Sequence, residues 1–119
     1  MPRQKKREPR EFVLENGLYP WGPFLDETPD DVLAAACFAR NLIIFMDGQP
    51  READGDVILG GKENQLSLAK KSGISQGVIS RVLSGRSYPD MSTVSNLETF
   101  VRGRLWCLPE ERYRPFRLD

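Results

Sequence analysis

Apolar residues recur at helical spacing between residues 28 and 47. One face has steps of three and four, at Val32, Ala36, Ala39, Ile43 and Met46. A second apolar stripe lies beside it, at Phe38, Leu42 and Phe45. Thr28 is a favoured N-cap residue and Pro29 suits the first helical position, so we expect a long helix that ends near Asp47-Gly48. The wide apolar arc indicates either a simple buried core helix or burial on two sides, for example at a dimer interface.

Two short helices are predicted further along, separated by a tight turn. Asn64 can cap a helix from Gln65 to Ser72, and Gly73 stands where a helix end needs a positive φ. Ser75 can cap a second helix that ends at Gly85. The buried side of this second helix is predicted to consist of Val78, Ile79, Val82 and Leu83. Two short helices joined by a glycine turn are typical of a helix-turn-helix, here at residues 65–84.

The outward side of the second helix is polar and contains no acidic residue. Its members fall on one helical face: Gln76, Gly77, Ser80, Arg81 and Ser84. An arginine can pair bidentately with guanine and a glutamine with adenine, and small residues let a helix lie close to base edges. Gly77 weakens a helix by about 1 kcal/mol relative to alanine. A close approach to DNA would account for it, and so would a surface position that is indifferent to helix strength.

The remaining segments look less regular. Prolines and glycines interrupt residues 1–27, so we expect a basic tip at 1–10 and an irregular segment that packs on the domain. Residues 47–63 are predicted to form a long loop in which Val57–Leu59 is one strand or a plug. The expected division is an N-terminal segment at 1–27, a helix-turn-helix domain at 28–106 and a tail at 107–119.

Composition narrows the chemistry further. The 119 residues contain no histidine and two cysteines, which excludes hydrolases with a histidine base and histidine-ligated metal sites. We expect Cys37 and Cys107 to be reduced core thiols, and we expect no cofactor or metal. No apolar run is long enough to span a membrane and no signal peptide is visible, so the predicted location is cytoplasmic.

The balance of 17 basic and 17 acidic residues hides a segregated charge pattern. Residues 1–10 hold five basic residues and one acidic residue, and residues 62–106 hold seven basic and three acidic residues. Residues 27–61 hold two basic and seven acidic residues. Two basic regions fit a nucleic-acid surface, although charges also cluster on solvated faces. The basic tip could enter a minor groove or only aid solubility, and the acidic loop is either a partner surface or a spacer.

The segment Gln65–Arg86, QLSLAKKSGISQGVISRVLSGR, resembles the helix-turn-helix of the phage repressor/Cro (Xre) family. Residues 88–98 are similar to the next stretch of that family. The resemblance implies an all-α fold, a compact bundle of about five helices that binds operator DNA in the major groove, often as a homodimer. It implies base contacts by Gln76, Gly77, Ser80 and Arg81. It implies phosphate contacts by Gln65, Ser75, Ser84 and Arg86.

We therefore expect a sequence-specific regulator of transcription, a repressor that binds double-stranded DNA and is not an enzyme. The alternative is a protein-interaction module of the same fold, antitoxin-like or an adaptor, that acts through a protein partner. The acidic loop and the broad first helix would then form its surfaces.

Overall fold

The computed structural model describes residues 6–53 and 55–112. The N-terminal part runs through a 3-10 helix, η1, and two strands: η1 Pro9–Phe12, β1 Val13–Leu18 and β2 Gly22–Phe24. The middle part contains α1 Asp30–Met46, β3 Arg51–Ala53 and β4 Asp56–Ile58. The C-terminal part contains α2 Gln65–Ser72, α3 Gln76–Ser84, α4 Met91–Val101 and a short 3-10 helix, η2 Pro109–Glu111.

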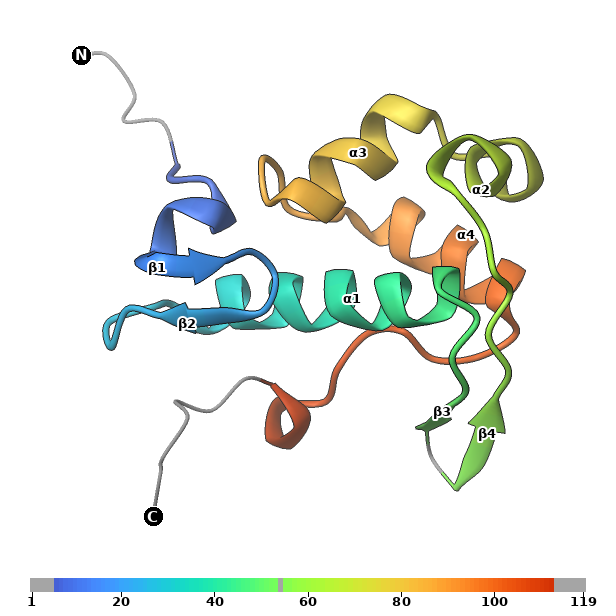
Figure 1. The fold of residues 1–119 in the computed structure, drawn as a ribbon, viewed down its shortest axis with the longest axis horizontal. Coiled ribbons are helices and arrows are strands. Elements are labelled where there is room, and N and C mark those ends of the chain that lie inside the picture. The colour runs from blue at the N-terminus through green and yellow to red at the C-terminus, as the bar shows by residue number, and fades with distance from the viewer. Residues whose placement is uncertain (1–5, 54, 113–119) are drawn as a thin grey trace.

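The long helix α1 lies through the centre of the molecule (Figure 1). The helices α2, α3 and α4 lie along one side of α1, and the segment that follows α4 returns along its other side (Figure 1). The β1–β2 hairpin lies near the beginning of α1, and the β3–β4 hairpin lies near its end (Figure 1). The helices α2 and α3, which contain most of the predicted DNA-contacting residues, are therefore supported by α1.

The expectation of an all-α bundle of about five helices is wrong. Within residues 6–53 and 55–112 there are four α-helices and two separate two-stranded antiparallel sheets. Glycines and prolines that suggested irregular chain instead form the turn between β1 and β2, where Leu18 pairs with Gly22. In the expected loop at 47–63, Arg51 pairs with Ile58 across a turn at Gly55, whose φ is +82°. Strands of three residues are too short to leave a clear alternating pattern in the sequence.

The start of the first helix also differs from the expectation. Pro29 is the N-cap and α1 begins at Asp30, while the hydroxyl of Thr28 donates to the carbonyl of Leu25 instead of capping the helix. Asp30 and Asp31 then occupy the first turn, where the helix dipole favours negative charge. Thr28 therefore closes the preceding turn rather than the helix.

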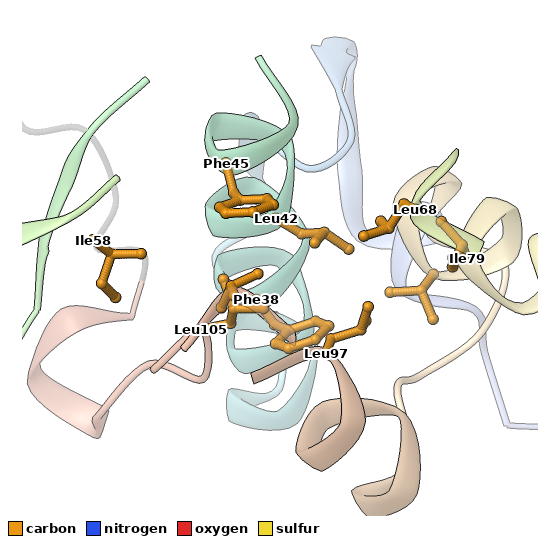
Figure 2. Packing of buried hydrophobic residues seen from close by; sticks show 10 residues of the cluster. Phe38, Leu42, Phe45, Ile58, Leu68, Ile79, Leu97 and Leu105 are labelled. Carbon is orange, nitrogen blue, oxygen red and sulfur yellow. The ribbon is translucent and has the colours of Figure 1, made fainter. Parts of the chain in front are cut away.

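The main hydrophobic core joins α1 to the helix-turn-helix. Phe38 and Leu42 of α1 point toward Leu68 of α2, Ile79 of α3 and Leu97 of α4 (Figure 2). All five side chains are fully buried. Burial of an aliphatic or aromatic side chain contributes about 1.5–3 kcal/mol, so this cluster is the principal support for the position of α3.

A second, smaller core packs on the N-terminal part of α1, beside the β1–β2 hairpin. It contains Phe12, Phe24, Val32 and Ala36, and Tyr19 and Tyr88 pack around it. Burial of α1 against these two cores explains its wide apolar arc without a dimer interface. No helix in the described part of the chain is long and apolar enough to cross a membrane.

The cysteines are not free thiols in this structure. Cys37 of α1 and Cys107 form a disulfide, with their Cα atoms 6.1 Å apart. The amide of Asn41, one turn further along α1, donates to the carbonyl of Leu105 at 2.9 Å and thereby holds the returning chain in place. The prediction of reduced thiols is wrong because it did not include this return of the chain after α4, which brings two residues 70 positions apart together.

Candidate nucleic-acid interface

Side-chain caps define the beginnings of α2 and α3. The backbone N–H of Ser67 donates to Oδ1 of Asn64 at 2.8 Å, and the N–H of Asn64 donates back to Oγ of Ser67 at 3.0 Å. At α3 the N–H of Val78 donates to Oγ of Ser75 at 3.2 Å. These bonds satisfy donors that a helix leaves free at its first turn. The sequence prediction of both caps is confirmed.

Two glycines in left-handed conformation end these helices. Gly73 has φ +80° and ends α2, and Gly85 has φ +77° and ends α3. At Gly85 a Cβ would lie 2.8 Å from the ring of Tyr19 and 2.9 Å from Cβ of Arg10. Two independent reasons therefore require a glycine at position 85: its positive φ and the close approach of the N-terminal segment. Both glycine turns were predicted from the sequence.

The inner face of α3 is anchored and its outer face is open. Ile79 and Val82 are buried against the core, while Leu68 of α2 is buried beside them. Among the described residues, Figure 1 shows no other segment over the outer side of α2 and α3. The helix pair therefore presents a firmly supported surface to the outside of the molecule.

The predicted base-contacting residues lie together on that open surface. Gln76, Gly77, Ser80 and Arg81 are all exposed on α3. A Cβ built at Gly77 would meet only a guanidinium nitrogen of Arg81, at 3.4 Å. A flat polar surface with one long basic side chain results, which suits a close approach to base edges.

The predicted phosphate-contacting residues surround this surface. Ser75 lies at the N-terminus of α3, and Ser84 and Arg86 lie at its C-terminal end; all three are exposed. Gln65, at the N-terminus of α2, is half-buried. The backbone N–H of Arg86 donates to the carbonyl of Arg81 at 2.9 Å and fixes the turn that presents the Arg86 side chain.

Charge on this surface is predominantly positive. The helix α3 has no acidic residue, and Lys70 and Lys71 lie near the end of α2. Glu63 is bonded to Lys71 at 2.7 Å and to the hydroxyl of Ser67 at 2.5 Å, and these contacts lower the pKa of its carboxyl group. Glu63 therefore remains ionised and neutralises Lys71, which leaves Lys70, Arg81 and Arg86 as basic groups of the surface.

The sequence did not reveal where the basic N-terminal segment lies. The N–H of Arg10 donates to the carbonyl of Gly85 at 2.9 Å, and the hydroxyl of Tyr88 donates to the carbonyl of Arg7 at 3.1 Å. Lys6 lies over the ring of Tyr88 at 4.1 Å. These contacts place basic residues beside the C-terminal end of α3. Residues 1–5 of the predicted basic tip lie outside the described part.

The basic groups of this segment are partly neutralised. Lys6 pairs with Asp31 at 2.7 Å, and Arg10 pairs with Glu8 at the same distance. Such exposed pairs are weak, so phosphate oxygens can compete for the same cations. The run of basic residues at 1–10 signalled the charge. The location of this segment depends on contacts with residues 75 to 82 positions away, which no local pattern encodes.

The fold and the open polar face of α3 together define a helix-turn-helix protein. This class of protein suggests a DNA-binding regulator of transcription. Residues 63–101 match the family model described as helix-turn-helix, and this match supports a helix-turn-helix of the phage repressor/Cro type in that segment. The match includes α2, α3 and α4 and stops before the returning segment. No curated protein and no solved structure gave a match.

Proposed function

We propose that this protein is a sequence-specific, double-stranded-DNA-binding repressor of transcription that acts as a homodimer in the cytoplasm. Residues 28–106 would be its DNA-binding unit. The helix α3 enters the major groove, where Arg81 and Gln76 read base edges while Gly77 and Ser80 permit a close fit. Gln65, Ser75, Ser84 and Arg86 contact phosphates on either side and fix the register of the helix.

One observation carries this proposal: the polar face of α3 is uncovered while its apolar face is fixed in the core. An uncovered helix on a firm support can enter a groove without rearrangement of the fold. The N-termini of α2 and α3 also border this face, and the N-terminus of a helix favours phosphate oxygens.

Two single substitutions test the assignment because each removes one positive charge from the same surface. After a binding site is selected from random duplexes, Arg81→Ala should weaken binding to that site by about 1–3 kcal/mol and relax its sequence preference. Arg86→Ala should weaken binding to selected and scrambled duplexes alike and reduce the slope of log affinity against log salt by about 1. Fluorescence anisotropy with labelled duplexes measures both quantities. If both variants lose the same affinity on both duplexes, α3 does not read bases.

The symmetry of the selected site tests the dimer. Two α3 helices about 34 Å apart would read half-sites about 10 base pairs apart, so the site should be palindromic. A selected site without internal symmetry would argue for a monomer on DNA.

A protein partner is the second candidate, because the acidic β3–β4 hairpin exposes apolar side chains. Val57 is 58% exposed and the neighbouring Leu59 is 75% exposed. A salt titration separates the candidates: a complex held by phosphates weakens steeply as salt rises. Absence of DNA binding even at low salt would favour the protein partner.

A further inference from the structure

The helix α4 has an open groove beside it that the helix-turn-helix does not use. The groove measures about 720 Å³. Its apolar lining is contributed by Pro89, Met91, Val94 and Trp106. Met91 stands at its edge and is 88% exposed, the highest value among the large exposed apolar side chains of the described residues. The ring of Trp106 packs on Phe38 at 6.2 Å, so this part of the groove is fixed on the core.

The outer face of α4 is a narrow stripe that runs along this groove. Met91, Ser95, Thr99 and Arg102 follow one another at steps of four, four and three, and all four are exposed. The opposite face carries the buried residues Thr93, Leu97 and Val101. Near the middle of the stripe Ser95 is small, so another helix can approach closely there.

The two ends of α4 carry opposite charges. Asp90 precedes the helix and Arg102 follows it, and both are exposed. The N–H of Thr93 donates to Asp90 at 2.7 Å, and this bond lowers the pKa of the carboxyl group, so Asp90 is ionised at neutral pH. Among residues 6–53 and 55–112, Arg102 has no ion pair. A rise of 1.5 Å per residue separates these two ends by about 18 Å.

The charges at the two ends of α4 are complementary to those of a second α4 helix that runs in the opposite direction. In an antiparallel pair of α4 helices, Asp90 of each copy lies opposite Arg102 of the other, whereas a parallel pair would oppose like charges. Glu98 does not disturb the pairing, because its carboxylate accepts the N–H groups of Leu105 at 2.7 Å and Trp106 at 2.9 Å. The occupant whose charges match the two ends of α4 is therefore a second copy of the same helix.

We propose that this face is the homodimer contact: two α4 helices pack antiparallel about a two-fold axis near Ser95, and Met91 of each copy enters the groove of the other. The arrangement is isologous, the commonest symmetry of homodimers. It rests on the proposed function in that it supplies the contact of the proposed DNA-binding dimer. The face spans only three helical turns, so the interface is smaller than the standard area of about 1,600 Å² and the dimer should dissociate reversibly.

A matched pair of substitutions tests this contact. Ser95→Glu places a carboxylate on each side of the axis, beside both copies of Glu98, and should leave the protein monomeric. Asn96→Glu makes the same charge change one position further along, on an exposed face outside the stripe. It should associate like the unchanged protein. Sedimentation velocity across a concentration series, without DNA, measures the monomer–dimer equilibrium. Circular dichroism should give both variants the same helix content.

DNA separates this proposal from the proposed function. On a duplex with a single half-site, Ser95→Glu should bind as well as Asn96→Glu. On a duplex with two half-sites, Ser95→Glu should lose the cooperativity that Asn96→Glu retains. The dimer contact is overturned if Ser95→Glu associates as strongly as the unchanged protein, if Asn96→Glu abolishes association equally, or if the unchanged protein is monomeric both free and on two half-sites. If the unchanged protein does not bind a duplex with a single half-site, the DNA-binding function is overturned instead.

Discussion

Gly77→Ala should change stability and DNA binding in opposite directions. The position lies in the first turn of α3, on the exposed face that we propose to enter the major groove. The added methyl group would contact only the movable end of Arg81, at 3.4 Å, so the folded protein accommodates it without strain. Alanine also restricts the unfolded chain more than glycine does, which favours the folded state.

The expected gain in unfolding free energy follows from helix propensity. A Gly-to-Ala change in a helix contributes about 0.5–1 kcal/mol, and a first-turn position should give the lower part of that range. The methyl group also stands between α3 and the bases, and the contacts of Gln76 and Arg81 must lengthen to make room for it. Loss of one good bidentate contact weakens specific binding by about 1–3 kcal/mol, at least a fivefold loss of affinity.

Urea denaturation and anisotropy titration on the selected duplex measure the two effects in the same preparation. Asn96→Ala is the control, because it also replaces an exposed helical residue with alanine but lies on α4 away from the proposed groove contact. It should stabilise the protein slightly and leave affinity unchanged. If Gly77→Ala stabilises the fold and binds the selected duplex as tightly as before, α3 does not approach base edges and the proposed orientation is wrong.

Two further predictions concern stability. Reduction of the disulfide should lower the free energy of unfolding by about 4 kcal/mol, the loop-entropy value for cysteines 70 positions apart. In urea denaturation, a reductant should lower the midpoint of the unchanged protein but not that of a Cys37→Ala/Cys107→Ala variant. The Tyr19 hydroxyl is buried without a hydrogen-bond partner among the described residues, and burial raises its pKa. The unfolded chain therefore loses this proton at lower pH than the folded chain does, so the free energy of unfolding should fall as pH rises above the ordinary tyrosine pKa of 10.0. Tyr19→Phe should reduce that fall. At neutral pH the same substitution should stabilise the protein by about 1 kcal/mol, because it removes a buried hydroxyl without a partner. An unchanged alkaline slope in Tyr19→Phe would contradict this account.

The helix-turn-helix could be predicted from the sequence because its signals are local. Asn64 and Ser75 cap helices that start at the next residue, and Gly73 and Gly85 end them with a positive φ. Each signal acts within about one helical turn, so it is visible without knowledge of the fold. The same reasoning placed the polar face of α3 outward, and whether that face reads bases stays a prediction.

The parts that could not be predicted depend on distant contacts. The hairpins contain strands of only three to six residues, and they depend on distant packing: Phe24 of β2 joins the smaller core and Ile58 of β4 joins the main core. The Cys37–Cys107 bond requires the chain to return along α1 after α4. The docking of Arg10 at Gly85 joins residues 75 positions apart, and the sequence around Gly85 fits a simple helix end equally well.

These distant contacts determine how α3 is held. Its buried residues Ile79 and Val82 rest on α1, which lies outside the matched family segment at 63–101. Its C-terminal end is fixed at Gly85 by the backbone of Arg10 and the ring of Tyr19. The local sequence therefore specifies the surface that we propose to contact DNA, while α1 and the N-terminal segment fix its orientation. Substitutions at the Gly85 contact should consequently alter DNA binding without touching DNA, because they change the angle at which α3 is presented.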